Sequence, residues 1–118
     1  MEIVKEFTFD AAHYLPNVPD THKCKNLHGH TYRVRLYIEG PLDPVLGWVM
    51  DFADIKAAWK PLEQLLDHQV LNDIPDMVNT TAEELAMWIY RQLKPKLPLL
   101  SRIELNETAA NGVVYRGV

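Results

Sequence analysis

Hydrophobic and polar residues alternate in two stretches near the start of the chain. Over residues 2–10 the odd positions carry Ile3, Phe7 and Phe9, and over residues 30–39 the even positions carry an equally apolar set. Successive side chains of a strand point to opposite faces, so both stretches predict half-buried strands.

The apolar spacing changes to steps of three and four residues in the middle of the chain. These steps predict an amphipathic helix over residues 51–67, in which Pro61 should cause a kink or lie in a break. Thr81 and Glu84 have the spacing of a capping box, so a second helix is expected to start there and to end at Pro95. Trp48, Trp59 and Trp88 are expected in the core.

Alternation returns near the end, where residues 101–107 and 113–116 predict two strands joined by an Asn111-Gly112 hairpin turn. The predicted order is β-β-α-α-β-β, an α+β fold with a four-stranded antiparallel sheet and two helices on one face. A chain of 118 residues suits one domain, spanning residues 1–118. The sheet would keep two open edges, so pairing with further copies of the chain is expected.

Three histidines interrupt the apolar alternation at one end of the first strand pair. His28 and His30 share the inward parity of Tyr32, and His13 continues the parity of Phe9. Antiparallel pairing places the end of one strand beside the start of the next, so the three imidazoles should converge. Three imidazoles can hold a catalytic zinc ion and leave a fourth position open, although iron, copper and nickel also accept imidazole. The alternative is a set of hydrogen-bonded core histidines.

Cys24 is the single cysteine and lies in the segment that joins these two strands, between Lys23 and Lys25. Neighbouring positive charge favours the thiolate, which makes Cys24 a candidate base or nucleophile. Two other interpretations stay open at this point. Cys24 could be a fourth zinc ligand in a structural site, or an incidental thiol.

Acidic side chains break the pattern at two further places. Glu107 shares the inward parity of Ile103 and Leu105, and a buried carboxylate requires a partner, such as a ligand with adjacent N–H groups. Alternatively, the strand ends before Glu107 and leaves it in solvent. Asp67 and His68 end the first helix, where the histidine could complement the helix dipole or form a proton relay with the aspartate.

The charge composition argues against two classes of binding partner. The formal net charge is −4, with 12 Lys and Arg against 16 Asp and Glu, so neither nucleic acid nor an anionic membrane surface is an expected partner. The N-terminal residues lack the apolar core of a signal peptide, and one cysteine permits no intrachain disulfide. These features favour a cytoplasmic protein.

Several motifs are spread over nearly the whole chain. They are residues 7–13, the Cys-x3-His-Gly-His run at 24–30, Leu-Asp-His at 66–68 with Leu-Asn-Asp at 71–73, and the C-terminal segments 107–108 and 114–117. Together they resemble the 6-pyruvoyltetrahydropterin synthase family, and within it the 6-carboxytetrahydropterin synthases of queuosine biosynthesis. The motifs keep the family's order and together are specific, whereas His-Gly-His alone would not be.

The resemblance implies a tunnelling fold (T-fold), whose subunits join their sheets edge to edge into barrels, usually as a hexamer of two trimers. It implies a lyase that converts 7,8-dihydroneopterin triphosphate to 6-carboxy-5,6,7,8-tetrahydropterin, acetaldehyde and triphosphate. The zinc ligands would be His13, His28 and His30. Cys24 would be the catalytic thiol, with Asp67 and His68 as relay partners supplied across a subunit interface, and Glu107 would anchor the pterin ring.

The segment before the second helix departs from the family pattern. It reads Thr81-Ala82-Glu83 where a hydroxyl residue is common at the middle position. Thr81 and Glu83 would still help to hold the pterin, but one secondary contact is missing.

Three alternatives are weighed against the carboxy-forming enzyme. The 6-pyruvoyl-forming enzyme of tetrahydrobiopterin synthesis typically has a longer spacing between the cysteine and His-Gly-His. A non-catalytic zinc module would use Cys24 as its fourth ligand. A folate-pathway aldolase or cyclohydrolase of the same fold is disfavoured, because a zinc-free pterin aldolase is not expected to carry this arrangement of His and Cys.

Overall fold

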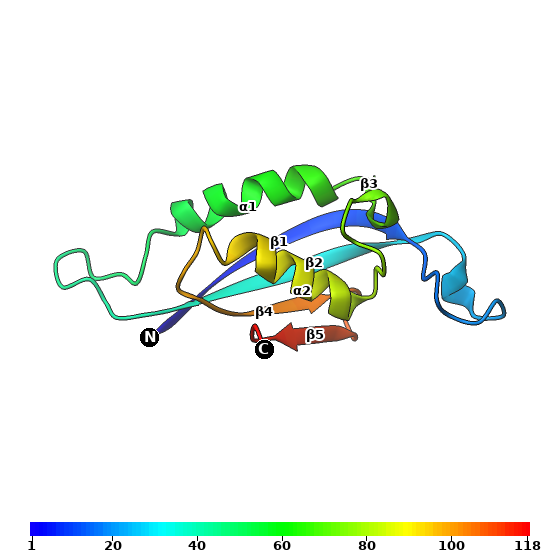
Figure 1. Cartoon of the computed structure of the whole chain (residues 1–118). Helices are drawn as coiled ribbons and strands as arrows, with labels where there is room; N and C mark the ends of the chain where they lie inside the picture. The colour runs from blue at the N-terminus through cyan, green and yellow to red at the C-terminus, as the bar shows by residue number, and fades with distance from the viewer.

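Two long antiparallel strands, β1 (Glu2–His13) and β2 (His28–Glu39), form the centre of the protein in this computed structural model of residues 1–118 (Figure 1). They pair along their whole length, from Glu2 opposite Glu39 to His13 opposite His28. Burial alternates along both, which confirms the two predicted half-buried strands. The first strand continues three residues beyond its predicted end and so carries His13 in regular strand geometry.

The sheet has five strands, in the order β3-β1-β2-β4-β5, so the prediction of four was one short. The additional strand, β3 (Gln69–Val70), pairs in parallel with Ala11 and Ala12 of β1. Two residues are too few for a period of two to be visible in a sequence, which is why β3 was missed. The remaining strands, β4 (Leu100–Asn106) and β5 (Gly112–Tyr115), are antiparallel neighbours as predicted.

The turn between β4 and β5 differs from the prediction, because Gly112 already belongs to β5 and residues 107–111 form the turn. The N–H of Glu107 donates to the carbonyl of Asn111 at 3.0 Å. The hydroxyl of Thr108 accepts from the N–H groups of Ala110 and Asn111 at 3.3 and 3.1 Å. This turn holds Glu107 at the end of β4 instead of releasing it into solvent.

Both long helices begin at side-chain caps. Asp51 accepts from the N–H of Ala53 at 2.9 Å at the start of α1 (Phe52–Leu66). Thr81 accepts from the N–H of Glu84 at 3.2 Å at the start of α2 (Ala82–Leu93), as the capping signal predicted. α1 continues through Pro61, so the helix is not broken there. Two 3-10 turns, η1 (Lys23–Lys25) and η2 (Leu71–Asp73), complete the elements.

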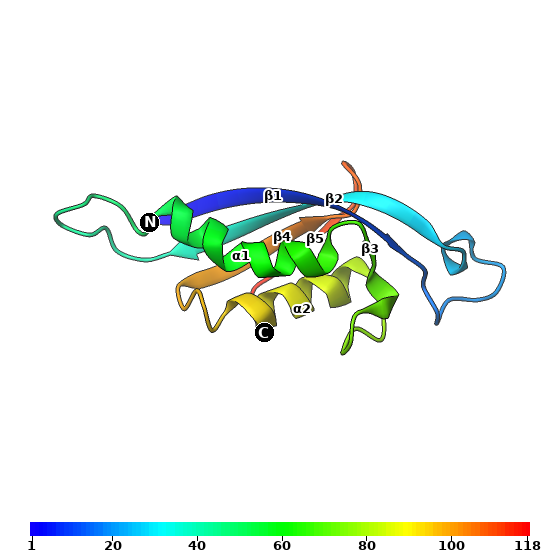
Figure 2. The ribbon, with the colours of Figure 1, turned by 90° about the horizontal axis from the view of Figure 1, so that it is seen from above.

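Both helices cover the same face of the sheet, and the core lies between the two layers (Figure 2). Trp59 and Trp88 are buried there, as expected. Trp48 is not: its side chain is 42% exposed, because it lies in the loop between β2 and α1, which extends beyond the helix layer (Figure 1). None of the helices has the length and apolar character needed to cross a membrane.

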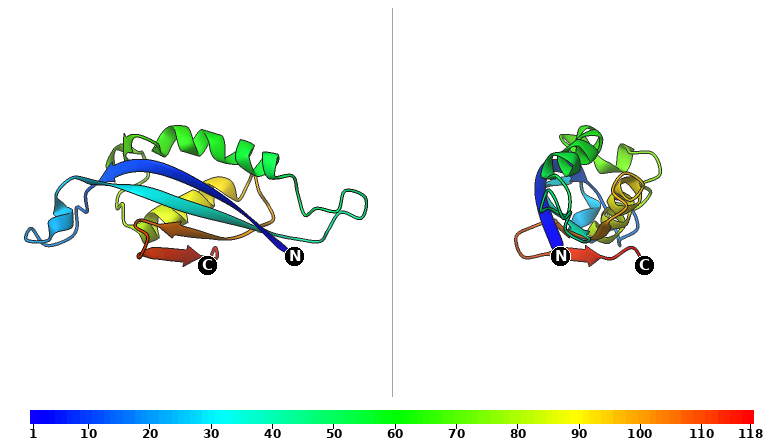
Figure 3. Two further views of the ribbon diagram at one scale, coloured as in Figure 1. Left: turned by 180° about the vertical axis from the view of Figure 1, so that it is seen from behind. Right: turned by 90° about the vertical axis from the view of Figure 1, so that its left-hand side faces the viewer.

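The opposite face of the sheet is polar, with Glu6 lying 3.7 and 3.5 Å from the Nε atoms of Arg33 and Arg35. The molecule is elongated, with extents of 58 × 24 × 23 Å, and loops project from both ends of the long strand pair (Figure 3). No strand of the chain pairs with the outer edge of β1 before Ala11, or with the outer edge of β5.

Candidate metal centre and active site

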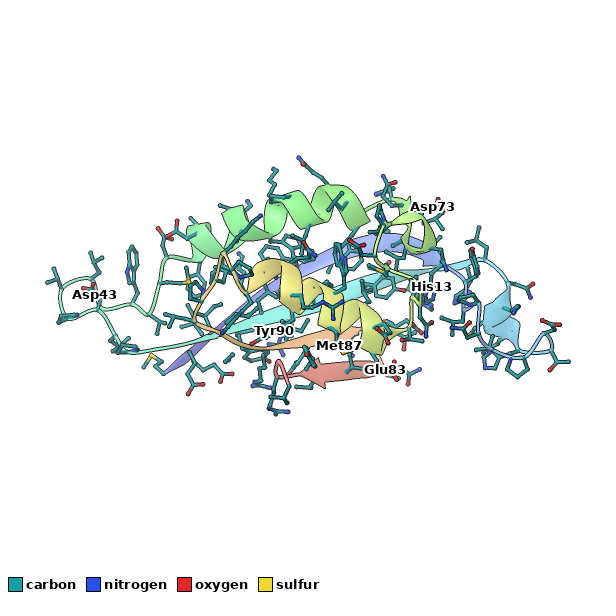
Figure 4. All side chains as sticks on the ribbon, viewed as in Figure 1. His13, Asp43, Asp73, Glu83, Met87 and Tyr90 are labelled. Carbon is teal, nitrogen blue, oxygen red and sulfur yellow. The ribbon has the colours of Figure 1, made fainter.

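His13 ends β1 with its imidazole on the inward face, where it is 1% exposed. Its Nδ1 lies 2.8 Å from the carbonyl oxygen of Thr80, in the loop before α2. A carbonyl oxygen can only accept, so Nδ1 carries the proton and Nε2 has a free lone pair. Figure 4 shows His13 at the end of the sheet from which the loop between β1 and β2 projects.

His28 and His30 reach the same place from the start of β2. The register sets His28 opposite His13 and His30 opposite Ala11. Nδ1 of His28 lies 2.7 Å from the carbonyl oxygen of Asn26, which fixes its tautomer in the same way. The ring centroids of the three histidines are 4.6–5.1 Å apart, and one nitrogen from each lies within 4.8 Å of the others. The predicted convergence of three imidazoles is therefore confirmed.

The chemistry of this histidine cluster fits a metal ion. The Nε2 atoms of His13 and His30 are buried and have no hydrogen-bond partner, which is costly for a core histidine but expected of a metal ligand. Burial lowers the pKa of both imidazoles below the ordinary 6.5 and keeps them neutral, the form that coordinates. Backbone carbonyls on Nδ1 are the partners that commonly orient zinc-binding histidines. Three such ligands leave one tetrahedral position for a substrate.

Glu107 lies beside the histidine cluster. Its two carboxylate oxygens are 3.5 Å from Nε2 of His30 and 3.9 Å from Nε2 of His13, and its side chain is 26% exposed. The prediction that Glu107 faces inward is confirmed. The same carboxylate lines a hollow of about 390 Å³ together with Thr81, Ala82 and Glu83.

The side chains of Asp67 and His68 are in contact, with Oδ2 and Nδ1 3.0 Å apart. The backbone N–H of Asp10 donates to Oδ1 of Asp67 at 2.9 Å, and the N–H of His68 donates to the carbonyl of Asp10 at 2.6 Å. The Asp10 N–H, and next the His68 side chain, hold the pKa of the Asp67 carboxyl below its ordinary 3.8. His68 adopts a φ of 60°, a left-handed conformation that a residue without a functional or structural reason rarely keeps.

The Asp67–His68 pair and the histidine cluster do not form one group of potential metal ligands within one chain. Asp67 and His68 lie close enough to share an ion only with Asp10. The His68 side chain is 77% exposed and lines a hollow of about 450 Å³ together with Asp10, His30 and Thr31. The predicted relay residues therefore contact each other, and His68 borders the same hollow as one histidine of the cluster.

Cys24 lies in η1, where its N–H donates to Nδ1 of His22 at 3.0 Å and its side chain is partly buried. Its thiol belongs to neither group of potential metal ligands. Lys25 does not turn toward it, because Nζ donates to the carbonyl of Pro16 at 2.7 Å and lies 3.5 Å from Asp20. The loop is thus held by Lys25, and the geometry gives no support to Cys24 as a fourth ligand.

Comparison with known proteins decides the family. The model of the 6-pyruvoyl tetrahydropterin synthase family matches residues 2–118. The chain belongs to this family. The structure of the Caenorhabditis elegans 6-pyruvoyl tetrahydropterin synthase superposes with a TM-score of 0.93 at 27% identity, covering 100% of this chain and 96% of that one. The predicted α+β T-fold is therefore confirmed, with a fifth strand added to its sheet.

Relatives within the 6-pyruvoyl tetrahydropterin synthase family carry different activities. The chain is 39% identical over 119 residues to the 6-carboxy-5,6,7,8-tetrahydropterin synthase of Synechocystis, covering 96% of this chain and 91% of the relative. It is 35% identical over 114 residues to the dihydroneopterin monophosphate aldolase of Pyrococcus furiosus, with 94% and 93% covered. Family membership alone therefore does not select one reaction on a pterin.

The contacts that Thr80 and Tyr32 make with the histidine cluster were not predicted from the sequence. Thr80 is fully buried, and besides its carbonyl contact with His13 its hydroxyl donates to the carbonyl of Tyr14 at 3.0 Å. Tyr32 is fully buried with its ring edge-on to His13 and His30, at centroid distances of 6.1 and 5.5 Å. Burial raises the pKa of the Tyr32 hydroxyl. For Thr80 the only available signal was its position just before the helix cap.

Proposed function

We propose that this protein is a zinc-dependent lyase that converts 7,8-dihydroneopterin triphosphate to 6-carboxy-5,6,7,8-tetrahydropterin, acetaldehyde and triphosphate, in queuosine biosynthesis. The observation that carries the proposal is the set of imidazoles of His13, His28 and His30, two with tautomers fixed by backbone carbonyls and two with unpartnered Nε2 atoms. The 39% identity over 96% of this chain to a 6-carboxytetrahydropterin synthase supports this reaction, and the three residues between Cys24 and His28 favour it over the 6-pyruvoyl-forming type.

His13, His28 and His30 would hold the zinc ion. When bound, zinc supplies a Lewis acid that polarises the oxygens of the substrate side chain. The chain's own contribution is to lower the pKa values of His13 and His30 by burial, which favours their neutral form, and to orient the rings of His13 and His28 by backbone carbonyls. The apolar ring of Tyr32 packs against both and limits water on the core side of the ligands.

Glu107 would hold the pterin ring. A carboxylate can accept hydrogen bonds from two adjacent N–H groups, as the amino-pyrimidinone edge of a pterin presents. The hollow of about 390 Å³ that Glu107 shares with Thr81 and Glu83 is large enough for one bicyclic ring. Ala82 lines the same hollow without a hydroxyl, so it contributes no polar contact there. A ring held in this way directs its side chain toward the histidines.

Cys24, Asp67 and His68 would move protons to and from the side-chain carbons. Proton transfer by a positioned side chain is worth about 10²- to 10⁴-fold in rate. The Asp67–His68 pair belongs to no potential ligand group with the histidines of its own chain, so the proposal has a neighbouring subunit supply it. The free edges of β1 and β5 support edge-to-edge assembly with further copies of the chain. The proposed assembly is a hexamer of two trimers with closed barrels, as the family resemblance implies.

Product analysis tests the proposal. Zinc-loaded protein is incubated with 7,8-dihydroneopterin triphosphate, and the pterin and aldehyde products are identified by mass spectrometry. The proposal predicts 6-carboxy-5,6,7,8-tetrahydropterin with an equal amount of acetaldehyde. A 6-pyruvoyl product would assign the protein to the tetrahydrobiopterin branch, and glycolaldehyde release would indicate aldolase chemistry. Absence of turnover with zinc held by one sulfur would favour the non-catalytic module with Cys24 as fourth ligand.

A further inference from the structure

The backbone of Cys24 is held at both of its polar groups. Its N–H donates to Nδ1 of His22 at 3.0 Å, and its carbonyl accepts from the N–H of Leu15 at 2.9 Å. Leu15 lines the same hollow as Glu107, so the second bond ties Cys24 to the wall of the proposed pterin site. The first bond is made by an exposed side chain that belongs to neither group of potential metal ligands.

The local backbone places His22 for this contact. Its N–H donates to the carbonyl of Pro19 at 2.8 Å, and its own carbonyl accepts from the N–H of Lys25 at 3.1 Å. With a φ of −76° and a ψ of 133° it is extended, the conformation of a residue that caps a helical turn. The imidazole therefore accepts from the central residue of η1, which is Cys24.

The contact selects one chemical form of His22. The N–H of Cys24 can only donate, so Nδ1 accepts and the proton of the neutral imidazole is on Nε2. The usual capping side chains are those of Ser, Thr, Asn and Asp. An aspartate here would accept the same bond, but its negative charge would oppose ionisation of a nearby thiol. A neutral imidazole holds the turn without that charge.

We infer that His22 is a positioning residue for Cys24, because its imidazole fixes the turn that carries the thiol. The inference rests on the proposed function, in which this thiol moves protons. η1 is a three-residue 3-10 turn in a loop that projects beyond the sheet (Figure 1), and such turns have poorer hydrogen bonds than an α-helix. Without the cap Cys24 can shift, and a misplacement of about 1 Å can lower a rate by about 10²-fold.

A matched pair of variants tests the inference. In His22→Asn the side-chain oxygen can occupy the place of Nδ1 and keep the cap, whereas in His22→Gln one further methylene carries the oxygen past it. Cys24 is the single cysteine, so protein grown with isotopically labelled cysteine gives one backbone amide signal by NMR. We expect hydrogen exchange of this amide to be about fivefold faster or more in His22→Gln, and within about twofold of wild type in His22→Asn.

Turnover and zinc content separate positioning of the thiol from a purely structural cap. We expect His22→Gln to lower kcat by about tenfold or more with KM within about twofold of wild type, and His22→Asn to restore kcat. A purely structural cap would leave kcat unchanged while the amide exchanged faster. Wild type and both variants should hold equal amounts of zinc, since His22 belongs to no group of potential metal ligands.

The outcomes that would overturn the inference are specific. Wild-type amide protection or wild-type kcat in His22→Gln would do so, and so would an equal loss of kcat in His22→Asn and His22→Gln. Loss of zinc in His22→Gln would place the effect at the metal and would also overturn it. If the amide responds as expected but wild type does not convert dihydroneopterin triphosphate, the proposed function fails and the hold of His22 on Cys24 stands.

Discussion

Nδ1 of His13 lies 2.8 Å from the carbonyl oxygen of Thr80, a residue 67 positions further along the chain. This contact joins the end of β1 to the loop before α2, and it decides which imidazole nitrogen is free. Because Thr80 occupies Nδ1, Nε2 is the nitrogen that is left buried without a hydrogen-bond partner. One backbone carbonyl thus couples the packing of the helix layer to the geometry of the histidine cluster.

Removal of one histidine should remove the metal. We expect His13→Ala and, separately, His28→Ala to lower bound zinc at a fixed chelator concentration by about tenfold or more. His28 is less buried than His13, so its variant separates ligand loss from a packing defect. Metal analysis by plasma mass spectrometry after gel filtration measures the effect. His22→Ala is the control, because the His22 side chain accepts its hydrogen bond from the N–H of Cys24 and belongs to no group of potential metal ligands. Full zinc content in His28→Ala would contradict the ligand assignment.

Cys24→Ala should separate catalysis from metal binding. The thiol belongs to no group of potential ligands, so we expect the variant to keep one zinc ion per chain. Loss of a general base should lower kcat by about 10²-fold or more. Parallel metal analysis and product assays on the same preparation test both expectations. If zinc is lost together with activity, Cys24 is a ligand and the site is structural.

Asp67 should contribute stability that depends on pH in the acidic range. Its pKa is held below 3.8 in the folded protein, so the unfolded chain binds a proton more readily than the folded one. The contribution is present above about pH 4 and is lost as the pH falls through the lowered pKa. Asp67→Asn should therefore unfold at a lower urea concentration than wild type at pH 7, with a smaller difference at pH 3. An equal difference at both values would show that the carboxylate charge is not involved.

Pro61 should cost stability, since α1 continues through an exposed proline that cannot donate the hydrogen bond its position requires. We expect Pro61→Ala to raise the free energy of unfolding by about 1–3 kcal/mol, partly offset by the greater freedom of the unfolded chain. Urea denaturation measures the change. Lys60→Ala, at the preceding exposed position, is the control and should be nearly neutral. Destabilisation by Pro61→Ala would indicate that the proline serves packing.

The histidine cluster could be predicted from the sequence because it depends only on strand parity and antiparallel pairing. His13 opposite His28 follows from two alternating segments joined by a loop, and the inward side of Glu107 follows from the parity of β4. The cap of α2 at Thr81 follows from residue spacing in the same way. Each of these is a local pattern that tertiary packing reinforces.

Other features depend on tertiary contacts that no local pattern encodes. β3 is two residues long, and its pairing with β1 follows from the left-handed turn at His68. Trp48 is exposed because the loop that carries it runs beyond the helix layer, although a large aromatic side chain is typical of a core residue. The approach of Glu107 to two Nε2 atoms requires side-chain positions that only the assembled sheet end provides.

Zinc K-edge X-ray absorption of the purified protein tests the central claim most directly. The account predicts one zinc ion per chain, with imidazole scattering from three histidines, nitrogen and oxygen neighbours at about 2.0–2.2 Å and no sulfur. A sulfur neighbour at about 2.3 Å, or protein that retains no stoichiometric zinc, would contradict it.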